Sequence, residues 1–211
     1  MKNLILSTSV IILGFLLSCT NAPKGEKATT TDAKPMAKKE MMASKTLSVQ
    51  EGSMLTWTGS KVGGTHAGTI NVSGGDVKVS DGAVTGGKVT IDMNSINCTD
   101  LEAGKGKEKL EGHLKSPDFF DTATNPTASF EITSVAGGNI TGNLMLKGVT
   151  KSVTFPANVN VTPDGVAVTS GEFTINRTDW GIQYGSASFF DGLKDKAIND
   201  NIGLSIKLKA M

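Results

Sequence analysis

From Leu47 onward, hydrophobic and polar residues alternate with a period of two along much of the chain. Alternation of this kind gives a strand one hydrophobic and one polar face, as in an antiparallel sheet with one side in water. The pattern therefore predicts an all-β protein whose Val, Ile, Leu and Phe side chains face the interior. It is clearest over residues 88–93, 128–133, 140–146, 153–161, 173–176 and 202–210.

Short segments rich in Gly, Asp, Asn and Pro separate these runs, and we interpret them as hairpin turns. They are Gly74–Asp76, Ser80–Gly82, Gly137–Asn139 and Pro163–Gly165. About eight strands joined in this way favour an antiparallel barrel, because closure removes the unpaired sheet edges. An eight-stranded barrel is wide enough to be filled by side chains or to hold one small ligand. The alternating residues alone leave both possibilities open.

One stretch, residues 99–114, breaks the alternation. Leu110 and Leu114 are four residues apart, and charged residues surround them. This spacing predicts a short helix that covers one end of the barrel, with Thr99 or Asp100 as its N-cap.

The N-terminus has the pattern of a signal peptide. Lys2 precedes an apolar run over residues 4–17, which is shorter than the ~20 residues that span a bilayer. The sequence Leu16-Leu17-Ser18-Cys19 resembles the lipobox of bacterial lipoproteins, in which the cysteine is acylated after cleavage. We therefore expect a lipoprotein signal peptide over residues 1–18 and lipidation of Cys19. The alternative is an ordinary secretory signal with a chance cysteine.

The chain between this signal and the barrel carries little hydrophobic character. Residues 20–45 contain no Val, Ile, Leu or aromatic residue, so they offer nothing that offsets the entropy of ordering. We expect residues 19–45 to be the lipidated cysteine and a disordered tether, and residues 46–211 to be the barrel. If Cys19 is acylated, Cys98 is left without a disulfide partner, and we expect it to be buried rather than reactive.

The charge balance and the scarcity of reactive side chains narrow the function. The chain has 21 Lys and Arg against 20 Asp and Glu, and this balance argues against a nucleic-acid binder, which would show a basic face. His66 and His113 are the two histidines, and no third ligand stands at a diagnostic spacing, so we expect no metal. No pattern of catalytic residues stands out, so we assign none.

His113 and Arg177 are two polar residues that could have either a structural role or a role in contacting a ligand. His113 lies at the end of the predicted helix, where a loop or cap hydrogen bond is one role and a ligand headgroup contact is the alternative. Arg177 is the one arginine of the chain. We expect it to pair with Asp118 or Asp179 and to fix the turn around it, with headgroup binding as the alternative.

Several motifs together resemble the YceI-like family. They follow the family's order across residues 46–211, and comprise Trp57–Lys61, His66–Gly68, Gly112–Asp121, Asn125–Phe130, Gly142–Phe155 and Phe173–Ile182. The resemblance implies an extended lipocalin-like barrel. It also implies an apolar tunnel that holds a long-chain amphiphile such as a polyisoprenoid, an isoprenoid quinone or a fatty-acid derivative. It thereby favours a hollow barrel over a filled one.

We therefore expect a membrane-tethered, periplasm-facing lipid-binding protein that is not an enzyme and has no cofactor apart from the bound lipid. The residue after Cys19 is Thr20, which by the same resemblance favours the outer membrane. The expected partners are a hydrophobic small molecule and, through the anchor, the membrane. Expected headgroup or mouth contacts are His66, His113 and Arg177. Expected tail contacts are Phe119, Phe120, Phe130, Ile132, Leu144, Leu146, Phe155, Phe173, Ile175 and Trp180.

Two other functions stay open. In the first, the barrel is filled by its own side chains and acts as an interaction module of the envelope without a ligand. In the second, His113 and an acid catalyse a reaction inside the barrel.

Overall fold

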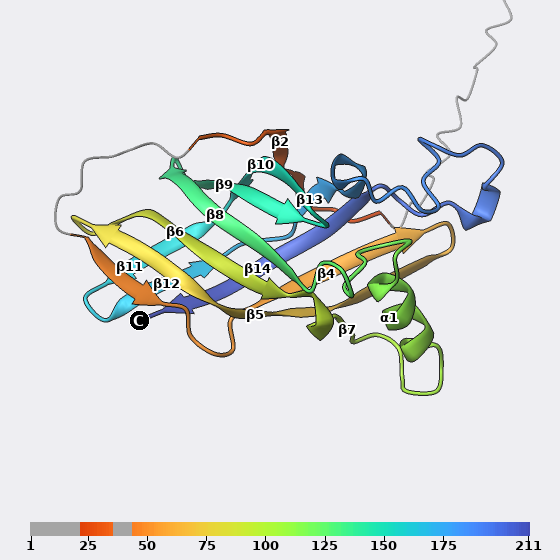
Figure 1. The fold of residues 1–211 in the computed structure, drawn as a ribbon, viewed down its shortest axis with the longest axis horizontal. Helices are drawn as coiled ribbons and strands as arrows, with labels where there is room; N and C mark the ends of the chain where they lie inside the picture. Colours follow the sequence, from red (N-terminus) through yellow and green to blue (C-terminus); the bar gives the residue numbers. More distant parts are fainter. Residues whose placement is uncertain (1–21, 36–43) are drawn as a thin grey trace, which may run out of the picture.

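Long strands pair edge to edge around a hydrophobic interior in the computed structural model, which describes residues 22–35 and 44–211 (Figure 1). They form one sheet in which a continuous path runs β1-β13-β14-β4-β5-β6-β8-β9-β10-β2. The strands are β1 Glu26–Lys27, β2 Thr29–Asp32, β3 Lys45–Ser48, β4 Met54–Lys61, β5 Gly64–Ser80, β6 Ala83–Asp92, β7 Asn97–Cys98, β8 Thr127–Ala136, β9 Asn139–Leu146, β10 Val149–Pro156, β11 Asn158–Thr162, β12 Gly165–Thr169, β13 Phe173–Asn176 and β14 Asn201–Ala210. The helices are α1 Lys107–Lys115 and the short 3-10 turns η1 Met93–Ser95, η2 Arg177–Trp180 and η3 Lys194–Lys196.

The predicted all-β class and single short helix are confirmed, but the strand number and pairing are not. The sheet has 14 strands rather than eight, of which ten lie on the continuous path. It is also mixed, because β1 runs parallel to β13 while the other pairs are antiparallel. The result is a nearly closed barrel.

One of the four predicted turns is part of a long strand. Gly74 and Gly75 lie inside β5, which is 17 residues long, and the register of β5 against β6 shifts between Val72 and Gly74. An irregularity of this kind bends a strand without ending it. The first part of β5 pairs with β4 and the second part with β6. The predicted turns at Ser80–Gly82, Gly137–Asn139 and Pro163–Gly165 do join β5 to β6, β8 to β9 and β11 to β12.

The described part of the expected tether differs from the prediction, because it enters the sheet. β1 pairs with Phe173 and Thr174 of β13, and β2 pairs antiparallel with residues 151–154 of β10. Between them, the Ala28 N–H donates to the Thr174 carbonyl at 2.8 Å, and Ala28 is buried. This short segment therefore joins β13 to β10, the strands next to the two ends of the path. Residues 1–21, with the expected signal peptide and Cys19, and residues 36–43 lie outside the described residues.

Backbone pairing explains why a polar segment is ordered here. A strand edge presents unpaired N–H and C=O groups, and any extended chain can pair with them whatever its side chains. The Thr-rich segment Thr29–Asp32 needs little hydrophobic burial to serve as such a strand.

Helix α1 lies at one end of the barrel, beside the β7 loop, as Figure 1 shows. It begins later than predicted, at Lys107, and its N-cap is Gly106 with a φ of 102° and no side-chain cap. The predicted caps Thr99 and Asp100 lie too far before Lys107 to cap the helix, and the Asp100 carboxylate bonds instead to His66 and to the Ala67 N–H. Among the described residues, no helix has both the length and the apolar character needed to cross a membrane.

The N-terminal segment should contribute to the closure of the barrel. We expect Ala28→Pro to lower the free energy of unfolding by about 1–3 kcal/mol, because it removes the N–H that bonds to Thr174 and leaves that carbonyl unpaired. Amide hydrogen exchange in β10 and β13 should quicken in the same variant. Ala33→Pro, the same change at an exposed position past the end of β2, is the control and should leave both measurements unchanged. Equal exchange in the two variants would contradict closure by this segment.

Candidate ligand-binding cavity

Two adjoining cavities occupy the interior of the barrel. Their empty volumes are about 860 and 800 Å³, figures that include the space at their openings. Both cavities are lined by Leu55, Ile91, Leu144, Ile175 and Leu204, so they adjoin at a shared hydrophobic wall inside the barrel.

The walls come from the inward positions of the alternating strands. The first cavity is lined entirely by hydrophobic side chains, and Leu204, Ile206 and Leu208 show the period of two along β14. The second cavity extends towards α1 and the end of β13, where Leu114 and Arg177 reach it. The prediction that the hydrophobic side chains of the alternating runs face the interior is confirmed.

Nine of the ten expected tail contacts line this space. The first cavity has Phe130, Ile132, Phe155 and Phe173, the second has Phe119, Phe120 and Leu146, and Leu144 and Ile175 line both. Trp180 does not line either cavity. It is 1% exposed, and its indole N–H donates to the Leu144 carbonyl at 3.2 Å, so it supports the wall from behind. That these residues bind a lipid stays a prediction.

A row of aromatic rings shapes the first cavity. Phe155 stacks on Phe173 with ring centroids 4.3 Å apart, and Phe130 lies 5.6 Å from Phe155. Phe130 fits because Gly142, on the neighbouring strand, has no side chain. A Cβ at Gly142 would lie 2.4 Å from the Phe130 ring. The glycine in the middle of β9 thus makes room for an aromatic wall.

Arg177 lies against the second cavity, but its guanidinium is fully engaged in protein contacts. It is 0% exposed and donates to the carbonyls of Asn199, Ile182 and Ile198 at 3.1, 2.7 and 3.1 Å. Burial lowers the pKa of Arg177, and the Asp200 carboxylate 3.3 Å away partly opposes that effect.

These contacts correct the expected ion pair and favour one of the two roles. The predicted partners Asp118 and Asp179 are wrong, since Asp200 pairs with Arg177. The sequence could not show this, because Asp200 lies beyond a long loop. Arg177 fixes both ends of that loop, which joins η2 to β14, and we assign it this positioning role rather than headgroup binding.

Two buried nitrogen atoms near the second cavity have no hydrogen-bond partner among the described residues. They are Nε1 of Trp57, which lines the cavity, and Nε2 of His113. The His113 ring packs edge-on against Phe119 and Tyr184, at centroid distances of 5.8 and 4.5 Å. Buried polar atoms are almost always paired, so these two are candidates for contact with a bound molecule. No feature of the sequence singled out Trp57 for this role.

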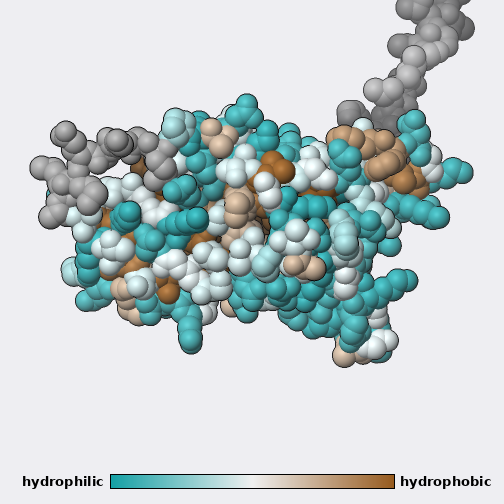
Figure 2. All heavy atoms as spheres, in the orientation of Figure 1, coloured by the Kyte–Doolittle hydropathy of each residue, from teal (hydrophilic) through white to brown (hydrophobic). Residues whose placement is uncertain are grey.

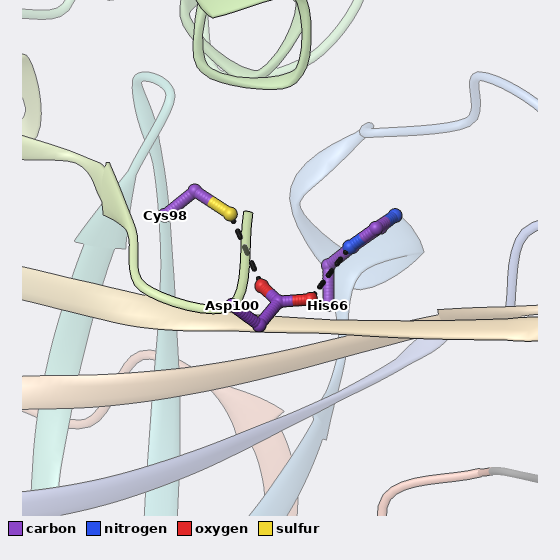
Figure 3. Close-up of side chains that lie close together, drawn as sticks. All are labelled: His66, Cys98 and Asp100. Atoms are coloured by element: carbon purple, nitrogen blue, oxygen red, sulfur yellow. Dashed lines mark hydrogen bonds and ion pairs between the residues drawn. The ribbon is translucent and has the colours of Figure 1, made fainter. Parts of the chain in front are cut away.

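His66 lies apart from this space. It does not line either cavity, and its Nδ1 bonds to Asp100 next to Cys98, as Figure 3 shows. The expected mouth residues are therefore not gathered at one place. Cys98 is buried, as predicted.

A hydrophobic patch lies on the surface at the same end of the barrel as α1. Phe189 and Phe190 are each 50% exposed, and Tyr184 and Val62 are also exposed. The loop between β13 and β14 carries most of this patch, which is the brown area at the upper right of Figure 2. Ile198, at the end of this loop, lines the second cavity. The patch thus stands close to one end of the internal space.

Solved structures share this fold at low sequence identity. Burkholderia cenocepacia BcnA has a TM-score of 0.56 and 21% identity, over 75% of this chain and 96% of that one. A protein described as a polyisoprenoid binding domain from Saccharophagus degradans, implicated in plant cell wall breakdown, has a TM-score of 0.55 and 18% identity, over 78% of this chain and 97% of that one. At these identities the similarity establishes the fold.

Curated relatives are similar over shorter stretches. A UPF0312 protein of Pseudomonas aeruginosa is 47% identical over 76 residues, which are 34% of this chain and 36% of that protein. A UPF0312 protein of Staphylococcus aureus is 33% identical over 115 residues, which are 52% of this chain and 63% of that protein. Each match thus spans less than two thirds of the relative. The YceI-like domain, in contrast, matches residues 47–210, so this chain belongs to the YceI-like family.

Proposed function

We propose that this protein holds a long-chain isoprenoid, quinone or fatty-acyl amphiphile in its barrel, and does so as a membrane-tethered protein facing the periplasm. The observation that carries the proposal is the pair of adjoining cavities inside the barrel, which share a wall of hydrophobic side chains. An interior of this chemistry suits a hydrocarbon chain better than a polar metabolite, which would leave its own hydrogen bonds unmade.

The energy of burial is sufficient for stable binding. Burying roughly 500 Å² of a hydrocarbon tail contributes about 12 kcal/mol at 25 cal/mol per Å². Association and ordering of the tail cost several kcal/mol or more, so an affinity in the micromolar range or tighter is expected. The fold neighbour described as a polyisoprenoid binding domain supports an isoprenoid among the possible ligands.

The location and the anchor rest on the sequence. The proposed signal peptide over residues 1–18 and the proposed acylation of Cys19 would hold the barrel at the periplasmic face of a membrane, and Thr20 favours the outer membrane. The exposed aromatic residues near one end of the cavity support contact with a bilayer, since aromatic side chains favour the boundary between lipid and water. We propose that the lipid enters and leaves at this end.

The structure bears on both alternatives. A barrel filled by its own side chains would lack the two cavities, so the ligand-free interaction module loses its main support. An enzyme that uses His113 and an acid needs that acid beside the ring, and the His113 side chain makes no hydrogen bond or ion pair with an acid among the described residues. We assign no catalytic residue and propose a binding protein rather than an enzyme.

A bulky residue in the shared wall tests whether the cavity holds a lipid. Leu144→Trp should fill space beside the wall that the two cavities share and weaken lipid binding at least about tenfold, which corresponds to 1.4 kcal/mol, so that less lipid co-purifies. Met145→Trp is the matched control, because Met145 is 37% exposed and points to the other face of β9. Organic extraction followed by mass spectrometry measures the lipid in each purified protein. Absence of lipid from the unaltered protein, or equal lipid in both variants, would contradict the proposal.

The unpaired Trp57 nitrogen generates a prediction about the kind of lipid. Trp57→Phe should weaken binding of a polyprenol or fatty acid about two- to tenfold (0.5–1.5 kcal/mol), because it removes an N–H donor for the ligand oxygen. Binding of a hydrocarbon of the same length without oxygen should change much less. Fluorescence displacement of a bound probe by each compound measures the two affinities. A similar loss for both compounds would show that Trp57 contributes packing alone.

A further inference from the structure

Three potential metal ligands of different chemistry meet on the side of the barrel, outside the cavity. They are His66 on β5, Cys98 at the end of β7 and Asp100 just after it, and Figure 3 shows the carboxylate of Asp100 between the other two. Their donor atoms all lie within 4.8 Å of one another. From this geometry, we propose that His66, Cys98 and Asp100 form a binding site for a divalent transition-metal ion, with zinc as the best match.

The backbone holds the three residues in place without a metal. Cys98 pairs with Gly68 across β5 and β7, and the Thr99 N–H donates to the Ala67 carbonyl at 2.9 Å. A Cβ at Gly68 would lie 2.0 Å from the Asn97 carbonyl oxygen, so a glycine is required for this close approach of the strands. Ligands whose positions are fixed in advance lose less entropy when an ion binds.

Outer contacts extend this support to the helix. The Ala67 N–H donates to Asp100 Oδ1 at 2.9 Å, and the Cys98 N–H donates to Glu111 Oε1 of α1 at 2.7 Å. Lys107 lies 3.8 Å from the same Glu111 oxygen. Hydrogen bonds from the surroundings orient ligands in known metal sites in the same way. A metal here would join β5 to the β7 loop and, through Glu111, to the helix whose Leu114 lines the second cavity.

The protons of the cluster are placed where an ion can replace them. The Cys98 S–H donates to Asp100 Oδ1 at 3.1 Å, and His66 Nδ1 lies 2.9 Å from Asp100 Oδ2. Burial alone would raise the pKa of Asp100, but the hydrogen bonds from Ala67, Cys98 and His66 hold it at about 2, so the group is a carboxylate. On binding, the Cys98 thiol loses its proton to solvent, and His66 exchanges its Nδ1–H for the Nε2–H tautomer through solvent, which frees Nδ1 to bind the ion. A divalent ion then balances the thiolate and the carboxylate, and the site has no net charge.

The chemistry of the three ligand atoms, a sulfur, a nitrogen and a carboxylate oxygen, indicates which metal the site would bind. Thiolate and imidazole ligands suit zinc and related transition metals, whereas Mg²⁺ and Ca²⁺ prefer oxygen alone. Bonds from zinc to sulfur, nitrogen and oxygen are about 2.0–2.3 Å long, so an ion between the three side chains reaches each with small adjustments. His66 and Asp100 side chains are 32% and 35% exposed, which gives the ion a path from solvent and leaves a fourth position for water.

Cobalt provides a direct test, because thiolate bound to Co²⁺ gives an intense charge-transfer absorption in the near ultraviolet. The full chain is stripped with a chelator and titrated with Co²⁺, and Zn²⁺ affinity is then measured against a chromophoric chelator. We expect one equivalent of each metal, the thiolate band, and a rise in Tm on addition of zinc. Cys19→Ser is the matched control, since it removes the other cysteine and should preserve all three results.

Variants of the ligands separate a metal site from a cluster held by hydrogen bonds alone. Cys98→Ser should abolish the band and weaken zinc binding by more than about 100-fold, a larger loss than outer contacts usually cause. Because Cys98 is buried, His66→Gln at a partly exposed position provides a second variant that keeps the fold, and it should weaken binding similarly. A folded unaltered chain that binds neither metal at micromolar concentration would overturn the proposal. So would equal zinc affinity in the unaltered chain and in folded His66→Gln.

Discussion

Backbone pairing around the sheet is the constraint on which the other features depend. A curled sheet can keep a hollow interior because its hydrogen bonds run along the wall and do not need side chains in the middle. The period-two alternation then supplies a hydrophobic lining on the inside and a polar surface on the outside. The last gap, between β10 and β13, is spanned by β1 and β2, which pair with both neighbours. The same backbone hydrogen bonds therefore close the wall of the barrel and keep its interior hollow.

The sequence predicted the features that depend on alternation. The inward positions of Phe130, Leu144 and Ile175 follow from polarity alone, and the structure places all three on the cavity wall. Whether the interior was hollow could not be decided in this way, because the same residues can pack together or leave space. Only the resemblance to a family favoured the hollow barrel, and the structure has the cavities that it implies.

The sequence did not predict the features that depend on contacts between distant segments of the chain. Strands β1 and β2 have no hydrophobic pattern, since their order comes from pairing with edges far along the chain. Asp200 was not recognised as the partner of Arg177, and the meeting of His66 with Cys98 and Asp100 was not recognised either. The Cys-x-Asp spacing at residues 98–100 is a weak pattern by itself. It gains meaning only when β5 brings a histidine beside it.

The ordered N-terminal segment has a consequence for the proposed anchor at Cys19. A disordered tether up to residue 45 would let the barrel drift well away from the bilayer. Because β1 begins at Glu26, the link from Cys19 to the wall reaches at most about 25 Å even when fully stretched. A lipidated form would therefore stay close to the membrane, and its rotation relative to the membrane would be restricted. Lipid exchange would then take place within one molecular diameter of the bilayer surface.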